Sequence, residues 1–161
     1  MQFDDLLRTW KAFFEDTRIR YALTGHLALH AYGYRPALPR IDVAVDKSGR
    51  ARTLQHAQSL GFHTVYTSPS CAIVSNDAEE FSRIAFVFTP AIHAWTIPYG
   101  GVLLPVRDPG TPLALSERDV AALGEATVRL SDAAYRQWLT LLSETGPPRR
   151  HNTDADEPFE L

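Results

Sequence analysis

The side chains best suited to chemistry lie on a glycine turn and on the strand expected to follow it. Thr24 and Gly25 separate a short apolar run, residues 19–23, from a segment of helical character. A strand that turns through glycine into a helix can hold phosphate, because the first N–H groups of a helix have no partner within it. Asp42 and Asp46 follow on a predicted strand, and magnesium in proteins binds carboxylates together with phosphate oxygens. A phosphate turn beside carboxylates would suit phosphoryl transfer on magnesium.

Residues 21–46 read YALTGHLALHAYGYRPALPRIDVAVD. This stretch resembles the core of nucleotidyltransferase-fold proteins of the AbiEii and minimal-nucleotidyltransferase kind, whose pattern is roughly A-L-I-G-G-x-A-x-x-A-Y-G-Y-P-R-A-T-K-D-I-D followed by apolar residues. The resemblance implies an α/β (α+β) fold, a mixed β-sheet flanked by helices, and nucleotidyl transfer as the activity. Laid on the pattern without a gap, the matching residues are Ala22, Leu23, Gly25, Ala28, Ala31, Tyr32, Gly33, Tyr34, Ala37, Ile41 and Asp42.

The departures from that pattern fall on the residues that the family uses for chemistry. His26 stands where the family has the second glycine of the turn, and Arg40 stands where it has the first aspartate of an Asp-x-Asp pair. The third carboxylate of the family, on the strand expected at residues 83–88, corresponds to Ala85. An arginine has no lone pair to give a metal ion and repels it by charge. Of the three carboxylates that the resemblance implies, Asp42 is the one that is kept.

Two neighbours decide what Asp42 can do. Arg40 lies two residues before it, on the same strand face, and can fill the site with a salt bridge. Asp46 shares that face but lies roughly 13 Å farther along the strand, at about 3.3 Å per residue, too far for both carboxylates to bind one ion. Under the resemblance, Asp42 is a residual catalytic residue and a weak metal ligand, and Gly25, His26 and Arg40 are the cofactor-binding positions.

His26 also has a second interpretation. His26 and His30 are four residues apart, a spacing that can bind zinc from one helix face. The glutamate of an H-E-x-x-H pattern does not accompany them, and no third ligand is evident. We therefore favour a histidine at a helix start, whose ring obstructs the close backbone approach that phosphate needs.

The turn and Asp42 must be brought together by the elements that carry them. We expect residues 19–23 and 40–45 to lie side by side in one sheet, with residues 25–32 helical between them. Apolar spacing predicts a helix from Phe3 to about Thr17. Further elements are a helix capped by Asp46 or Ser48 and ending at Gly61, strands at 62–67, 71–75, 83–88 and 102–106, and helices from Ser116 and Ser131. The strand at 102–106 is expected at the periphery, because Pro98 and Pro105 disfavour a central place.

Length and composition favour one domain. The chain has 161 residues, of which 45% are apolar, enough for one core. We assign residues 1–145 to a single domain, and 146–161, rich in proline, charge and asparagine, to a disordered tail. Cys71 is alone, so an internal disulfide is excluded.

Charge and hydropathy bear on partners and location. The formal net charge is −3, which gives the molecule no general attraction to nucleic acid or membrane, although a local basic patch is compatible with it. The first residues lack the basic and small-residue features of a signal peptide. No apolar run approaches the ~20 residues that span a bilayer. We expect a cytoplasmic protein that does not bind membranes, and the sequence leaves the oligomeric state open.

Three functions stand as hypotheses, because a fold alone does not establish function. The favoured one is a catalytically degenerate nucleotidyltransferase-fold protein that binds a partner, either protein or RNA, and needs no cofactor. The second is an active enzyme with a remodelled metal site, which would use magnesium and an NTP to transfer NMP to RNA or protein. The third is a plain interaction module of a toxin–antitoxin or phage-defence system.

Overall fold

The computed structural model describes residues 3–32, 40–78, 83–99, 101–108, 113, 115–124, 136, 139–140 and 149–151, with the backbone alone at 3, 26, 29 and 149–151. Its helices and strands are α1 (Phe3–Thr17), β1 (Tyr21–Leu23), α2 (Gly25–Ala31), β2 (Ile41–Asp46), the 3-10 turn η1 (Lys47–Gly49), α3 (Arg50–Ser59), β3 (His63–Thr67), β4 (Cys71–Ser75), β5 (Arg83–Thr89), β6 (Ala94–Tyr99), β7 (Val102–Arg107), α4 (Glu117–Leu123) and β8 (Arg149–His151).

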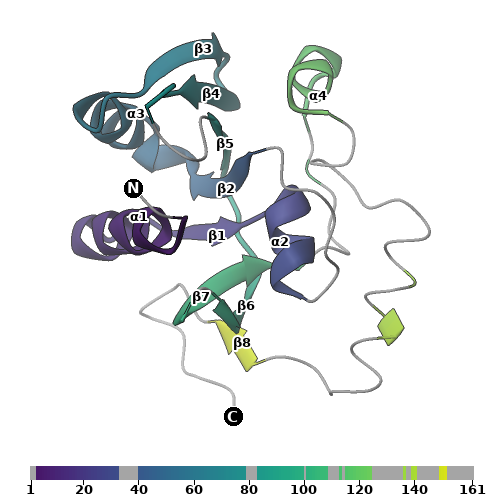
Figure 1. The fold of residues 1–161 in the computed structure, drawn as a ribbon. Helices are drawn as coiled ribbons and strands as arrows, with labels where there is room; N and C mark the ends of the chain where they lie inside the picture. Colours follow the sequence, from purple (N-terminus) through teal and green to yellow (C-terminus); the bar gives the residue numbers. More distant parts are fainter. Residues whose placement is uncertain are drawn as a thin grey trace.

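The described strands form one mixed sheet in the order β3-β4-β5-β2-β1-β7-β6-β8. β2 is antiparallel to β1 and parallel to β5, and β7 is parallel to β1. In Figure 1 the strands follow one another from β3 at the top to β8 at the bottom, with α1 and α3 to the left and α4 to the right. The prediction that β1 and β2 lie side by side with α2 between them in the chain is confirmed.

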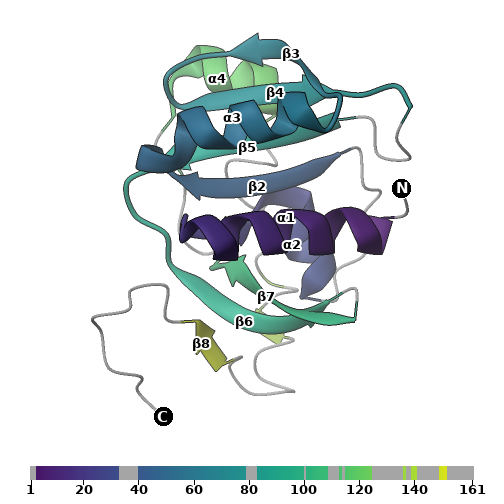
Figure 2. The same cartoon turned by 90° about the vertical axis from the view of Figure 1, so that its left-hand side faces the viewer.

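One face of the sheet carries the larger hydrophobic cluster. The amphipathic spacing predicted for α1 is confirmed, since it buries Leu6, Leu7, Trp10 and Phe14. The Trp10 ring lies 5.2 Å, centroid to centroid, from Phe86 on β5. α1 and α3 lie across the front of the sheet in Figure 2. Burying each such side chain stabilises the fold by about 1.5–3 kcal/mol, so this face holds the main core.

The opposite face is lined by smaller side chains. Cys71, Ile73, Ala85 and Val87 pack there with Leu113 and Leu123. Ile92, on the connection between β5 and β6, packs with Ala22 and Ala94. This face, partly covered by α4, is the one that carries the candidate site.

Two strands differ from expectation. β7 was expected at the periphery, but it lies between β1 and β6. Its pairing with β1 is recorded at Val106, one residue beyond Pro105, so the missing N–H of that proline does not interrupt the contact with β1. β6 was not expected at all, because Pro98 and its mixed polarity hide the strand, yet it pairs with β7 along its whole length.

The C-terminal segment is described in part. Arg149–His151, inside the segment expected to be a disordered tail, form β8 and pair antiparallel with β6. The other residues of 146–161 lie outside the described residues, as does most of the helix predicted from Ser131, of which residues 136, 139 and 140 are helical. Across the described part of the chain, no helix is both long enough and apolar enough to cross a membrane.

Candidate functional site

A row of neighbours across three strands brings the predicted site residues together. β1 and β2 pair Leu23 with Val43, so Thr24 comes next to Asp42, and the Thr24 N–H donates to the Asp42 carbonyl at 3.0 Å. On the other side, Asp42 is the register partner of Ala85 on β5. Two of the three positions that the resemblance assigned to metal-binding carboxylates, 42 and 85, are therefore direct cross-strand neighbours, and position 85 carries a methyl group.

The Asp42 carboxylate is held by Arg40. Nε of Arg40 donates to Oδ1 of Asp42 at 2.7 Å, and the two side chains are 14% and 1% exposed. Nη2 of Arg40 also donates to the carbonyl of Leu123. The salt bridge expected from the two-residue spacing is confirmed, and it is a buried one.

Leu123 is the last residue of α4, and α4 is fixed to the sheet by Asp119. The Tyr66 hydroxyl donates to Oδ1 of Asp119 at 2.8 Å, while the Asp119 N–H donates to Oγ of Ser116 at 3.2 Å. Burial raises the pKa of Asp119, but hydrogen bonds from Ser68, Tyr66, Cys71 and Ser116 outweigh it and hold this pKa below its usual range. The predicted cap at Ser116 is confirmed, and it orients the helix whose end accepts from Arg40.

The turn at the end of β1 has the backbone that its glycine permits. Gly25 has φ 59°, a left-handed value that side chains rarely adopt. The side chain of His26 lies outside what the structure describes, so its obstructing role stays a prediction. His30 contacts Tyr99, whose hydroxyl lies 2.8 Å from Nδ1 of the ring. Among the described residues, no three side chains of the metal-ligating types gather in one place.

A residue that sequence reasoning missed also borders the turn. Arg107 ends β7, is 6% exposed, and donates from Nη1 to Oγ1 of Thr24 at 3.4 Å. Burial lowers its pKa, while the charge of Asp108 acts in the opposite direction. The sequence marks it as a charged residue ending an apolar run, but the pairing of β7 with β1 places it. A buried guanidinium thus lies on the strand two places from that of Asp42.

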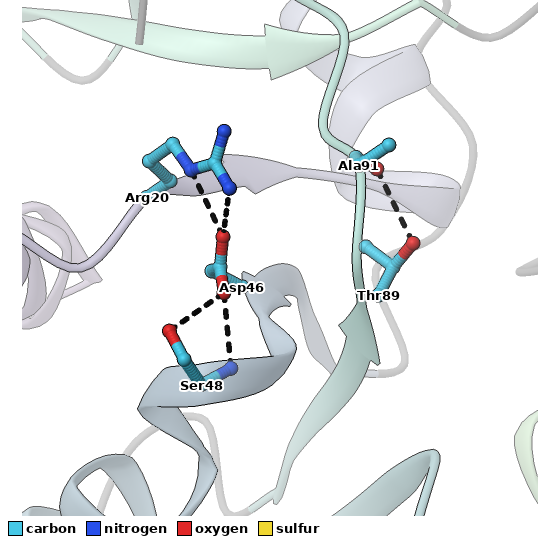
Figure 3. Close-up of polar contacts among 5 residues, drawn as sticks. All are labelled: Arg20, Asp46, Ser48, Thr89 and Ala91. Carbon is cyan, nitrogen blue, oxygen red and sulfur yellow. Dashed lines mark hydrogen bonds and ion pairs between the residues drawn. The ribbon is translucent and has the colours of Figure 1, made fainter. Parts of the chain in front are cut away.

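Asp46 lies at the other end of β2, where its carboxylate binds Arg20 and Ser48. Both Nε and Nη2 of Arg20 donate to its Oδ2, the first at 2.9 Å. Oδ1 accepts from the N–H and the hydroxyl of Ser48 at 2.9 and 2.7 Å, as Figure 3 shows. Burial raises the pKa of Asp46, but the hydrogen bonds from Ser48 and Arg20 bring it below its usual value. Asp46 caps the 3-10 turn η1 and stays apart from Asp42. The helix that Asp46 or Ser48 was predicted to cap, α3, instead begins after Gly49 and has no side-chain cap.

The row does not fit the magnesium that the fold family would use. Two-metal transfer needs carboxylates that bridge ions about 3.5–4 Å apart, and each magnesium requires near-octahedral oxygen ligands. Here the one carboxylate, Asp42, is paired with Arg40, and its neighbour on β5 is Ala85. We therefore derive no step through a metal ion at this site.

Known proteins resemble the chain in structure rather than in sequence. No protein-family model matches the sequence, and no curated protein is similar to it. Lincosamide antibiotic adenylyltransferase LnuA, in its lincomycin-bound crystal structure, has a TM-score of 0.56 at 14% identity, with 91% of this chain and 99% of that chain covered. The solution structure of antibiotic-resistance factor ANT(2'')-Ia has a TM-score of 0.46 at 14% identity, covering 96% of this chain and 76% of that one. At such identity the likeness to LnuA concerns the fold alone: this chain has the α/β nucleotidyltransferase-like fold predicted from its sequence.

Proposed function

We propose that this chain is a catalytically degenerate nucleotidyltransferase-fold protein, which acts by binding a partner, protein or nucleic acid. The observation that carries the proposal is the row formed by Thr24, Asp42 and Ala85 on neighbouring strands. This row has one carboxylate, and Nε of Arg40 already donates to its Oδ1 at 2.7 Å. The fold is kept, and the groups that would bind metal ions within it are replaced.

The charges around Asp42 also support a catalytically degenerate site. A cation that binds Oδ1 of Asp42 must displace Arg40, and breaking a buried ion pair costs about 3–5 kcal/mol. A displaced guanidinium would still lie nearby, and two unit charges of like sign 4 Å apart repel by about 4 kcal/mol at an effective dielectric constant of 20. A divalent ion would feel roughly twice that repulsion. Both effects act against metal-dependent transfer.

A second candidate is an active enzyme with a remodelled site that transfers NMP to RNA or protein. Two arginines favour it, since the partly buried Arg40 and the buried Arg107 flank the residues beside the Gly25 turn and guanidinium groups suit phosphate. It ranks lower because Arg40 is already committed to Asp42 and the Leu123 carbonyl.

The setting that we propose comes from the resemblance of residues 21–46 to the AbiEii and minimal-nucleotidyltransferase kind. Under that reading the chain is a cytoplasmic member of a toxin–antitoxin or phage-defence system. Its partner would be the RNA or protein with which that system deals.

A transfer assay tests the proposal. The wild-type chain and Asp42→Asn are incubated with each labelled NTP, magnesium, and RNA or protein acceptors. We expect the two to give the same background. Transfer by the wild type that disappears in a folded Asp42→Asn variant, with folding checked by thermal unfolding, would establish the active enzyme instead.

A further inference from the structure

Five basic residues lie on the two segments that lead into β1 and that follow β2. They are Arg18, Arg20, Lys47, Arg50 and Arg52, and we call them the basic end. We propose that the basic end binds the phosphodiester backbone of nucleic acid. The inference rests on the proposed function and deepens it, because it names the class of partner and the surface that the partner contacts.

The sheet and α3 bring these residues together. Arg20 immediately precedes β1, and its carbonyl accepts from the N–H of Asp46, the last residue of β2, at 2.9 Å. Lys47 follows Asp46 directly, and Arg50 is the first residue of α3. The basic end therefore lies at the opposite end of β2 from Asp42, so it is separate from the degenerate site.

The local charge is positive although the whole chain is negative. Asp46 is paired with Arg20, and Glu15 on the last turn of α1 is paired with Lys11 at 2.6 Å. Asp16 is the other exposed acid beside the turn that leads into β1. Arg18, Lys47 and Arg52 are exposed, and among the described residues none of the three forms an ion pair. They are thus available to a polyanion.

Two of the four guanidinium groups are held in place. Arg20 is fixed by two hydrogen bonds to Asp46 (Figure 3). Arg50 donates to Oγ1 of Thr67 at 2.8 Å and to the Ser68 carbonyl at 3.1 Å, and its guanidinium lies 5.5 Å from the Phe88 ring centroid. Fixed guanidinium groups lose little freedom on binding, and their planar donors match phosphate oxygens.

The backbone at Arg18 gives an independent reason to assign these residues a role. Arg18 has φ 59° and is the one described residue other than glycine with a positive φ. Its N–H donates to the Glu15 carbonyl at 3.2 Å and the Ile19 N–H to the Phe14 carbonyl at 3.0 Å, the Schellman arrangement in which glycine is usual. A strained arginine where glycine would be easier points to a function for its side chain.

The chemistry of the surface favours nucleic acid over an acidic protein. Strong protein interfaces need buried aromatic or apolar anchors. The large exposed apolar side chains of the described residues are Val65, Leu103 and Leu139, and none lies on the segments that carry the basic end. Positive charge without stacking or apolar groups is suited to phosphates, so the binding should not depend on base sequence.

Charge reversal with a matched control tests the surface. Fluorescence anisotropy would measure binding of labelled single-stranded RNA, duplex RNA and single-stranded DNA, each of about 20 nucleotides, from about 50 to 200 mM salt. Lys47→Glu with Arg52→Glu should weaken binding about tenfold or more and reduce the slope of log affinity against log salt by about 1.4 for single strands. The control Arg83→Glu with Arg118→Glu makes the same charge change at exposed positions on β5 and α4, and should leave binding within about twofold.

Arg18→Gly separates function from folding. Glycine suits the positive φ, so this variant should keep or raise the melting temperature while binding nucleic acid several-fold more weakly. No binding by the wild type at low salt, equal losses in both charge-reversal pairs, or unchanged binding by Arg18→Gly would overturn the inference, and the partner would then be a protein. Nucleotide transfer together with binding at the basic end would overturn the proposed function but not this inference.

Discussion

Arg40 determines the chemistry open to Asp42, because it neutralises the carboxylate and ties it to the end of α4. The Asp42 carboxylate lies against this guanidinium and beside the methyl group of Ala85. A charge so deeply buried is stable only while it is paired. Arg40 therefore stabilises the fold through this ion pair.

This role predicts a large effect of Arg40→Leu. Removing the guanidinium leaves the Asp42 carboxylate buried without its ion-pair partner, and we expect the free energy of unfolding to fall by about 3 kcal/mol. Urea unfolding measures the change. Arg83→Leu, at an exposed position on the neighbouring strand, should stay within about 0.5 kcal/mol. Equal effects of the two substitutions would mean that the salt bridge contributes nothing.

The lowered pKa of Asp119 makes the free energy of unfolding depend on pH. Its pKa in the folded state is held below the usual range, so its stabilising effect is present above the unfolded value of about 3.9 and is lost as the pH falls through the folded value. Stability should therefore decline from about pH 4 downward. Tyr66→Phe removes one hydrogen bond to Asp119, worth about 1–2 kcal/mol at neutral pH, so the free energy of unfolding should fall less between pH 7 and pH 3 in this variant. Unfolding curves of the wild type and of Tyr66→Phe at the two pH values measure the difference. An unchanged pH dependence in that variant would contradict the role of the Tyr66–Asp119 contact.

Part of the site was predictable from the sequence. The two-residue spacing of Arg40 and Asp42 predicted their salt bridge, and the resemblance placed Ala85 beside Asp42; both are found. Arg107 could not be predicted, because it approaches Thr24 only through the pairing of β7 with β1. Such a contact between residues 83 positions apart leaves no local pattern in the sequence.

At the scale of elements, local signals predicted the strands whose residues alternate or form apolar runs. β4 and β5 were predicted within a residue or so of their observed bounds. β6 was missed because Trp95, Thr96 and Pro98 break any simple pattern, and its strand conformation depends on pairing with β7. The inner position of β7 likewise follows from tertiary pairing, against the expectation that its proline raised.

β8 gives a prediction at this scale. Among the described strands it is an edge strand of three residues that pairs with β6, and each backbone hydrogen bond contributes about 0.5–1.5 kcal/mol net at best. Truncation after residue 148 should lower the free energy of unfolding by less than about 1 kcal/mol. Hydrogen exchange of amides in Ala94–Thr96 should nevertheless become faster, because that edge loses its cover. A larger loss of stability, or unchanged exchange, would contradict this view of β8.

At the scale of the whole molecule, the two ends of β2 carry different chemistry. Asp42 is paired with Arg40 at one end, while the basic end at the other offers exposed positive charge. With a net charge of −3, the rest of the surface repels polyanions and so directs them to that patch. Under the proposed function, the basic end is the surface through which the chain binds its partner.

The most direct test of the degenerate site is divalent-metal binding measured by titration calorimetry. Magnesium and manganese are titrated into the wild type, Arg40→Asp and Arg40→Asn. Arg40→Asp restores a carboxylate two residues before Asp42, and Arg40→Asn removes the same positive charge without adding a ligand. Ala85 is left unchanged, because a carboxylate at this fully buried position would cost several kcal/mol.

We expect no saturable binding by the wild type up to about millimolar metal, and an affinity for Arg40→Asp about tenfold or more above that of Arg40→Asn. Tight magnesium binding by the wild type that is lost in Asp42→Asn would contradict it, since Asp42 would then be a working metal ligand despite Arg40.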